Sequence, residues 1–489
     1  MQRREINNIL LLSLPAVWEP GVAENKYNAD HAFNLGLAYL AGQLRHNGLN
    51  VRILDCLVED PLNIRQAEPG WEEVGLSDEA IIAIIRDFGP DLIGVSIPFS
   101  CQHYLAHELV NKIREEFPEV LVVAGGNHVS AVPEKMDQDL FDYLIIGEGE
   151  LAFQHLIDAL NNGEAINWQQ GVVTKTSLIH HHAPFIHDLN QLPFPAIDLL
   201  PVRKLWGNGR RWINMVATRG CVYDCNFCAI HTIMGYPIRR RSVENVIAEI
   251  EHWKKTFNIQ EIYFEDDNLT TNRKWAKELF REIARHKFGL RLYARNGIRA
   301  DSIDREMLTL MKAAGFHDFY IAPESGSQRT LDEYIGKKMK LEDVTNAVKL
   351  AGEVGIEAMA FFVLGFPEED WNDLETTFKY AKYLKSLGCA RFWVSVAAPY
   401  PGTRLHKQCL EQGLISEDID YRRLRVAKSI IHNDNFTTGE LEAYRNMVMD
   451  ELNEPPLSIP AKIKKGGFLL VTDPNFLFVK LRYKLGAYL

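Results

Sequence analysis

Hydrophobic runs alternate with amphipathic stretches through the first 160 residues of the chain. Short runs rich in Leu, Ile and Val predict buried β-strands, and the longer stretches between them have the 3.6-residue period of helices. The expected strands are 9–12, 51–55, 92–96, 121–124 and 143–146. Because strands that alternate with helices form parallel sheets, we expect a flavodoxin-like, doubly wound α/β domain over 1–160.

Residues 161–205 interrupt this alternation. The periodicity fades, and Asp188 begins the run D-L-N-Q-L-P-F-P-A-I-D-L-L-P, which contains three prolines. Proline is disfavoured inside helices and strands because it lacks the backbone N–H. We therefore expect a linker over 161–205.

A second alternation, with longer spacing, follows the linker. Its expected strands are 213–218, 260–265, 291–296, 317–322, 357–364 and 391–397, and helical patterns such as 243–257 and 373–387 lie between them. Six βα units are too few for an eight-fold barrel, so we predict a partial (βα)6 TIM-like barrel over 206–410. Residues 411–489 are expected to form a small, mainly helical C-terminal extension.

Composition narrows the classes of protein. A net charge of -11 argues against nucleic acid as a partner, because phosphate backbones require clustered Lys and Arg. The apolar run at 9–14 is too short for a signal peptide, and no run approaches the ~20 apolar residues of a membrane span, so we expect a cytoplasmic protein. Basic and aromatic residues mix between Lys462 and Lys484. We favour a helix that packs on the barrel over a membrane-surface segment, because Gly466, Gly467 and Pro474 interrupt any long amphipathic helix.

Three of the seven cysteines carry the strongest chemical signal. Cys221, Cys225 and Cys228 have the spacing C-x-x-x-C-x-x-C in the loop after the first barrel strand. Three thiolates can hold three corners of a [4Fe-4S] cubane and leave the fourth iron open to another ligand. The alternatives are clustered core cysteines and a zinc site completed by His231. The run 180–182 of three histidines has no second cluster beside it, so we interpret it as a solvated loop.

With this motif in place, residues 213–405 resemble the core of radical S-adenosylmethionine (SAM) enzymes. The resemblance implies that Phe227 packs near the SAM adenine and that Asp266 and Asp267 approach the SAM ammonium. It also implies SAM contacts for Glu324 and Ser325 in P-E-S-G-S, and for Gly365 and Glu369 in G-F-P-E-E. Each residue also has a structural interpretation, as core packing, a helix cap or a turn. Glu368 and Asp370 depart from the family's G-x-P-G-E-T pattern after the fifth strand. The turn P-Y-P-G-T at 399–403, after the sixth strand, is similar to the family's P-x-P-G-T turn. Residues at the barrel mouth are expected to contact substrate, namely Tyr293, Arg295, Tyr320 and Tyr400.

The N-terminal domain resembles the cobalamin-binding (B12-binding) domain of many radical SAM enzymes. Neither G-x-G-x-x-G after the first strand nor a P-loop is present, which disfavours common nucleotide sites. The stretch 142–150 matches the family's D-Y-x-x-x-G-E-G-E, and glycines at strand ends would let a nucleotide tail lie against the backbone. The resemblance implies a cobalamin site that contains Ser96, Ser100, Gly125, Gly126, His128, Gly147, Glu148 and Gly149.

A departure from D-x-H-x-x-G bears on how cobalt would be held. Counting back from Gly36 places Phe33 at the position where such domains carry an axial histidine, and His31 lies two residues too early. The resemblance therefore implies base-off, His-off cobalamin, with Phe33 in its pocket.

The function implied is that of a cobalamin-dependent radical SAM methyltransferase. A 5′-deoxyadenosyl radical would activate an sp3 C–H bond of a small-molecule substrate, and methylcobalamin would deliver the methyl group. An external electron donor such as flavodoxin or ferredoxin is expected. A second hypothesis keeps the cofactors without methyl transfer, as a cyclase, oxidase or rearrangement enzyme on a tetrapyrrole, lipid or antibiotic-type substrate. A third is a non-catalytic corrinoid or redox module, which the intact cysteine loop disfavours.

Overall fold

The structure is a computed structural model, and it describes residues 4–18, 34–67, 70–175, 177, 181–206 and 209–453. The chain divides into two compact units. The first unit comprises Met1–Cys221 and Ala229–Ile262, and the second comprises Val222–Cys228 and Tyr263–Leu489. The loop of the three cysteines therefore contributes to both.

A six-stranded sheet forms the centre of the first unit. Its strand order is β3-β1-β6-β7-β8-β9, in which β1 pairs in parallel with β3 and β6, and β9 is antiparallel to β8. The strands are β1 (Asn8–Ser13), β3 (Asn50–Asp55), β6 (Leu92–Ser96), β7 (Leu121–Gly125), β8 (Tyr143–Ile145) and β9 (Val172–Val173). All five expected strands form, and the order of the parallel five is that of a flavodoxin-like domain, so the predicted fold is confirmed.

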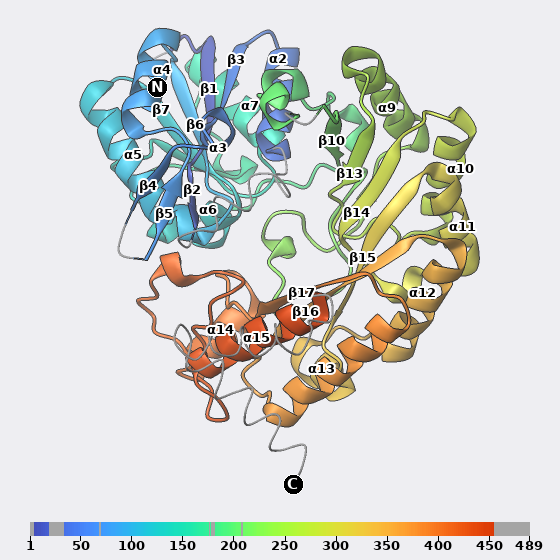
Figure 1. The fold of residues 1–489 in the computed structure, drawn as a ribbon. Helices are drawn as coiled ribbons and strands as arrows, with labels where there is room; N and C mark the ends of the chain where they lie inside the picture. The colour runs from blue at the N-terminus through green and yellow to red at the C-terminus, as the bar shows by residue number, and fades with distance from the viewer. Residues whose placement is uncertain are drawn as a thin grey trace. The chain divides into compact units, whose positions relative to one another are not determined.

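Helices cover both faces of this sheet, with α4 and α5 on one side and α2 and α7 on the other (Figure 1). These are α2 (Leu35–His46), α4 (Asp78–Phe88), α5 (His103–Glu116) and α7 (Gly149–Asn162). The shorter helices α3 (Cys56–Glu59), α6 (Asn127–Ala131) and α8 (Val202–Leu205) also belong to this unit, together with α9 (Val243–Phe257). Helix α4 illustrates the local logic, because the Ser77 side chain caps its first turn and Gly89 ends it in the left-handed conformation.

Two small antiparallel ribbons in the first unit lie outside the sequence prediction. One is the sheet β2-β5-β4, made of Ala16–Trp18, Glu72–Val74 and Ile64–Gln66. The other pairs β11 (Thr218–Arg219) with β12 (Arg239–Arg240). Strands of two or three residues are too short to show a period of two, so the sequence carries no signal for them. The segment expected to be a linker includes β9, and the backbone N–H of Ala196 donates to the carbonyl of Ala38 on α2 at 2.8 Å.

The second sheet has the order β10-β13-β14-β15-β16-β17. Its strands are β10 (Trp212–Met215), β13 (Glu261–Phe264), β14 (Arg291–Ile298), β15 (Phe316–Glu324), β16 (Glu357–Leu364) and β17 (Arg391–Val396). All six expected strands form, and β14 to β17 pair in parallel. Figure 1 shows helices along one face of β14–β17, namely α10 (Arg273–His286), α11 (Arg305–Ala314), α12 (Leu341–Val354) and α13 (Trp371–Ser386). The predicted partial barrel is confirmed.

Most residues between 412 and 437 of the C-terminal extension are irregular, and one α-helix follows them among the described residues. After α14 (Arg404–Glu411), helix α15 (Thr438–Asn453) packs on the last strand, where the Asn453 side chain bonds both the N–H and the carbonyl of Phe392 at 2.9 Å. The basic and aromatic tail around Lys462 lies outside the described residues. Within the described part of the chain, every helix is too short or too polar to cross a membrane.

Candidate functional site

A cavity with about 980 Å³ of empty space lies within the first unit, at the carboxyl ends of the sheet strands. Parallel sheets bind ligands at this edge, where the strand order reverses. Six of the residues expected to bind cobalamin line the cavity, namely Ser96, Gly125, Gly126, Gly147, Glu148 and Gly149. Phe33 and His31 lie outside the described residues. Ser100 and His128 are not among the residues that line the cavity.

Two glycines at strand ends have conformations that other residues rarely adopt. Gly126 has φ of 112°, and a Cβ atom there would lie 2.7 Å from the carbonyl oxygen of Ile97. Gly147 has φ of 95°, and a Cβ atom there would lie 2.3 Å from the ring of His182. Because neither position has room for a side chain, the backbone itself forms the cavity wall. His182 is half-buried and its Nε2 donates to the carbonyl of Thr232 at 2.7 Å, so the expected solvated loop is wrong for this histidine.

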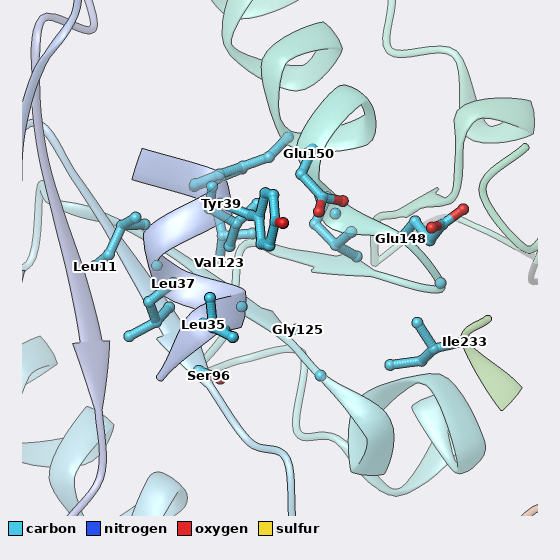
Figure 2. A pocket seen from close by; sticks show the side chains of 18 of the residues that line it. Leu11, Leu35, Leu37, Tyr39, Ser96, Val123, Gly125, Glu148, Glu150 and Ile233 are labelled. Atoms are coloured by element: carbon cyan, nitrogen blue, oxygen red, sulfur yellow. The ribbon is translucent and has the colours of Figure 1, made fainter. Parts of the chain in front are cut away.

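Most of the remaining wall is apolar. Figure 2 shows Leu11, Leu35 and Leu37 gathered on one side, with the carboxylates of Glu148 and Glu150 on the other. A cavity lined by glycines and apolar side chains suits a cofactor whose nucleotide tail ends in an aromatic base, because the base gains from burial and the backbone can approach the tail closely. The residues present therefore fit cobalamin.

His128 is buried beside the cavity in a short chain of polar groups. Its Nδ1 lies 3.0 Å from the hydroxyl oxygen of Ser100, and its Nε2 lies 2.9 Å from Nδ1 of His103. Burial, and then the charge of His103, lower the pKa of His128 to about 3. Burial, and then the charge of His107, lower the pKa of His103 to about 4. Both rings are therefore neutral at pH 7 and engage each other.

A buried ion-pair network, which we call the arginine brace, closes one side of the cavity. Arg219 donates to Glu148 Oε1 at 2.8 Å and to Glu150 Oε1 at 2.5 Å. Arg239, the β12 partner of Arg219, donates to the other oxygen of Glu148. The Arg219 guanidinium lies 5.0 Å from the ring centre of Tyr39 on α2. Burial alone would lower the pKa of Arg219, but the charges of Glu150 and Glu148 outweigh it and raise that pKa.

The sequence predicts Glu148 for the cobalamin site but gives no sign of its partners. Glu150 belongs to the stretch 142–150 that matches the family pattern, and this match is the signal in the sequence that could have indicated a role for it at the site. Arg219 and Arg239 lie 71 and 91 residues from Glu148, and nothing in one sequence reports so distant a pairing.

Cys221 lies two residues after Arg219, and the first unit holds its backbone on both sides. Its N–H donates to the carbonyl of Gly235 at 3.2 Å, and its carbonyl accepts from His231 Nε2 at 2.9 Å. The His231 ring stacks on Tyr236 with 3.6 Å between centres. His231 is thus a backbone partner of the loop, which disfavours the zinc alternative. No three His, Cys, Asp or Glu side chains converge to chelate one metal ion in the described residues.

The second unit holds the other two cysteines. Between Cys225 and Cys228, Asn226 donates its backbone N–H to Ile335 at 3.0 Å, and its carbonyl accepts from Leu405 at 2.9 Å. The guanidinium of Arg299 lies 3.5 Å from the ring centre of Tyr223 in the same loop. Burial by itself lowers the pKa of Arg299, but Asp301, Tyr223 and Cys225 together raise it, so a fixed cation lies near the loop. All three motif cysteines are half-buried.

The four remaining cysteines do not gather. Cys56, Cys389 and Cys409 are buried, and burial raises the pKa of the Cys389 and Cys409 thiols to about 12. Such thiols stay protonated and inert, as expected for packing residues.

Residues expected to bind SAM occupy several strand ends of the second unit. Phe227 packs against Phe366 with 5.9 Å between ring centres. Asp266 is buried and Asp267 is half-buried, both just after β13. Glu324 ends β15 with φ of 64° and pairs with Lys337 at 2.6 Å.

Two expected SAM contacts have their side chains engaged within the protein. Ser325 is fully buried, and its hydroxyl lies 3.0 Å from that of Thr377. The Glu369 carboxylate accepts the N–H groups of Gly365 and Phe366 at 2.7 and 3.0 Å, and burial raises its pKa to about 8. Glu369 therefore fixes the turn after β16.

The residues expected to contact substrate are only partly brought together. Tyr293 stacks on Tyr263 with 4.5 Å between ring centres, and Arg295 lies 4.8 Å from the Tyr293 ring. The Arg295 guanidinium also pairs with Asp318 at 3.1 Å. Tyr320 stacks separately on Phe361, and Tyr400 belongs to the turn after β17.

Both domains match known protein families. Residues 29–157 match the family model of the B12 binding domain, and residues 215–381 match that of the radical SAM superfamily. An uncharacterized methyltransferase of Pyrococcus horikoshii is 31% identical over 444 residues, which cover 89% of this chain and 91% of that protein. Cytidylyl-2-hydroxyethylphosphonate methyltransferase of Streptomyces wedmorensis is 28% identical, with 83% of each chain covered.

Solved structures share the fold. OxsB, a cobalamin-dependent SAM radical enzyme solved with aqua-cobalamin and SAM, superimposes with a TM-score of 0.72 at 20% identity, covering 91% of this chain and 67% of that one. The radical SAM methyltransferase TsrM of Kitasatospora setae, solved with cobalamin and a [4Fe-4S] cluster, gives 0.65 at 19% identity, covering 83% and 75%. The three chains thus share one fold.

The fold and the two matched domains define an enzyme that works with a [4Fe-4S] cluster, SAM and cobalamin. The chain belongs to the B12-binding methyltransferases of the radical SAM superfamily.

Proposed function

We propose that this enzyme methylates an sp3 carbon of a small-molecule substrate. The observation that carries the proposal is the glycine-lined, apolar cavity of the first unit, whose wall contains Arg219 two residues before Cys221. When bound, the three cofactors supply the chemistry: reductive cleavage of SAM gives a radical that removes hydrogen from the substrate, and methylcobalamin supplies the methyl group.

The cysteine loop is the proposed cluster site. Cys221, Cys225 and Cys228 would supply three thiolates, and the backbone bonds of Cys221 and Asn226 described above hold the loop on either side. Arg299 would offset part of the negative charge that three thiolates bring. Phe227 and the residues at the ends of β13, β15 and β16 would hold SAM. Of these, Ser325 and Glu369 would act by fixing backbone, since their side chains already have protein partners.

The cavity is the proposed cobalamin site. Gly125, Gly126 and Gly147 would let the nucleotide tail lie against the backbone, and Ser96 would offer a hydroxyl at the mouth. The base-off, His-off mode stays a prediction, because His31 and Phe33 lie outside the described residues. The assignment of Phe33 to this site stays a prediction.

Tyr293 and Arg295 are the proposed substrate contacts in the second unit. Their side chains share one face of β14, and a guanidinium over aromatic rings suits a polar or planar small molecule. The relative that is 28% identical is named for a cytidylyl-phosphonate substrate, and this supports a small polar substrate of that kind. We further propose a cytoplasmic enzyme reduced by a flavodoxin or ferredoxin.

The products of SAM decide between methyl transfer and another radical outcome. The reconstituted enzyme is incubated anaerobically with a reductant, cobalamin and candidate substrates, and the nucleoside products are quantified. Methyl transfer yields S-adenosylhomocysteine and 5′-deoxyadenosine together, whereas 5′-deoxyadenosine alone indicates a cyclase or rearrangement. Relatives at 26% identity are named as magnesium-protoporphyrin IX monomethyl ester cyclases, so that outcome is the specific rival. Formation of neither product would refute the radical function.

A further inference from the structure

The arginine brace connects the wall of the cavity to the backbone of the first cluster cysteine. Glu148, Glu150 and Arg219 all line the cavity, so a bound ligand meets the brace directly. Their side chains are 1%, 8% and 6% exposed, which leaves little water to weaken the pairs. Ions this deeply buried hold their geometry, because separating them would leave an uncompensated charge in the interior.

The connection from Arg219 to Cys221 is short and rigid. One residue separates them, and Gly220 has φ of 88° with its missing Cβ position 2.4 Å from the carbonyl oxygen of Pro237. The backbone at Gly220 therefore packs directly against the backbone of residues 234–237. A displacement of Arg219 is therefore transmitted to Cys221.

A second set of cavity residues is connected to the same cysteine through Gly235. Ile233 and Met234 line the cavity, and the next residue, Gly235, accepts the N–H of Cys221. Arg239 ties this segment to the brace, because it donates to the carbonyl of Met234 at 2.7 Å while pairing with Glu148. Cys221 is thus connected to two residues that line the cavity. Arg219 precedes it by two residues in the chain, and Met234 precedes the residue that accepts its N–H.

We propose that Arg219 is a positioning residue that couples the cobalamin cavity to the iron-sulfur cluster, so that loading either cofactor changes the binding of the other. The proposal rests on the cobalamin and cluster sites of the proposed function. Coupling between two sites is reciprocal, so each cofactor must alter the affinity of its counterpart by the same factor. A buried network of ion pairs can switch between distinct arrangements of its side chains. If each cofactor favours one arrangement, its binding changes the dissociation constant of the other cofactor.

The test measures hydroxocobalamin affinity on full-length protein, with and without the reconstituted cluster, by anaerobic absorbance titration. In the wild-type protein we expect the two dissociation constants to differ by about fivefold or more, the usual lower range of coupling between sites. The electron paramagnetic resonance signal of the reduced cluster should also change when cobalamin is added. Arg219→Met should still bind both cofactors, with the ratio of dissociation constants near one and the cluster signal indifferent to cobalamin.

Arg114→Met is the matched control. Arg114 pairs with Asp142 at 2.6 Å in the same unit and bonds the carbonyls of Leu140 and Val120, none of which lines the cavity. It should lose stability but keep the wild-type coupling. If Arg219→Met does not fold, Glu150→Gln replaces it, because it weakens the brace while Arg219 keeps its pair with Glu148 and the Gln amide oxygen can still accept from it.

The outcomes separate the coupling from the proposed function. A wild-type ratio of one, or full coupling in both brace variants, overturns the inference while the proposed function stands. Failure of the wild-type protein to bind hydroxocobalamin or to assemble a cluster overturns the proposed function itself.

Discussion

Glu324 and Lys337 form a buried ion pair in the second unit, with 2.6 Å between Oε1 and Nζ and side chains that are 9% and 7% exposed. The backbone of Glu324 has φ of 64°, which is unfavourable for any residue but glycine. The carbonyl of Lys337 also accepts from Arg299 at 3.0 Å. The pair therefore holds a strained strand end, and the same arginine contacts the cysteine loop.

Removing Lys337 should destabilise the fold, because the buried Glu324 carboxylate loses its ion-pair partner. We expect Lys337→Met to lower the free energy of unfolding by about 3–5 kcal/mol, because it leaves the Glu324 carboxylate buried and unpaired. The double variant Lys337→Met/Glu324→Gln should recover part of that loss. Urea denaturation of the single and double variants measures both effects, and equal stability of the two would contradict the pairing.

The cysteines should separate into cluster ligands and inert packing residues. Cys225→Ala is expected to abolish the broad iron-sulfur absorbance of the reconstituted protein and the formation of 5′-deoxyadenosine. Cys409→Ala should retain both, because Cys409 is buried outside the cysteine loop and burial raises the pKa of its thiol to about 12. Iron and sulfide analysis of both variants checks this, and a full cluster in Cys225→Ala would refute the ligand assignment.

Gly126→Ala should impair cobalamin binding. The added methyl group would meet the carbonyl oxygen of Ile97 at 2.7 Å, at a φ of 112°. We expect the affinity for hydroxocobalamin to fall by about tenfold or more, since a shift of 1.4 kcal/mol already gives a factor of ten.

Gly48→Ala is its control, because Gly48 also has positive φ but nothing lies within 4 Å of its Cβ position. It should lose about 1 kcal/mol of stability and keep its cobalamin affinity. Equal affinity losses in both variants would show that backbone strain, and not the cavity wall, is responsible.

Arg299→Met should make the cluster harder to reduce. A buried cation near Cys225 stabilises the reduced cluster, which carries one more negative charge. Its removal should lower the midpoint potential by tens of millivolts, given that about 59 mV corresponds to a factor of ten for one electron. Redox titration monitored by electron paramagnetic resonance measures the shift, and an unchanged or higher potential would argue against this role.

Glu369 should make stability fall as pH rises. Burial raises its pKa from 4.5 to about 8 in the folded protein, so the folded state keeps a proton that the unfolded state has released. The stabilisation is complete below pH 4.5 and is lost as pH rises towards 8, at about 1.4 kcal/mol per pH unit.

Glu369→Gln removes this titration and can still accept both backbone N–H groups. The difference in free energy of unfolding between wild type and variant should therefore change steadily across this pH range in denaturant titrations. Parallel profiles would mean that Glu369 is ionised in the fold.

Much of the fold was predictable because buried strands appear in the sequence as short apolar runs. Runs such as 92–96 and 357–364 contain apolar side chains that must be covered, and each became a strand at nearly its expected bounds. The short strands β11 and β12 were missed, because two residues have no periodicity to read. Their pairing depends on contacts made far along the chain.

The sequence by itself determined the cofactor chemistry and the order of the two domains. Cys221, Cys225 and Cys228 lie within eight consecutive residues, so the sequence itself fixes their spacing. The glycines at the ends of β7 and β8 are likewise visible in short stretches of sequence. Tertiary structure alone decided that Arg219 meets Glu148 and Glu150 across about 70 residues, and that Arg239 meets Glu148 across 91 residues. Such ion pairs form only when helices and strands that are distant in the sequence pack together. A single sequence does not show which of its distant residues will be neighbours in the fold.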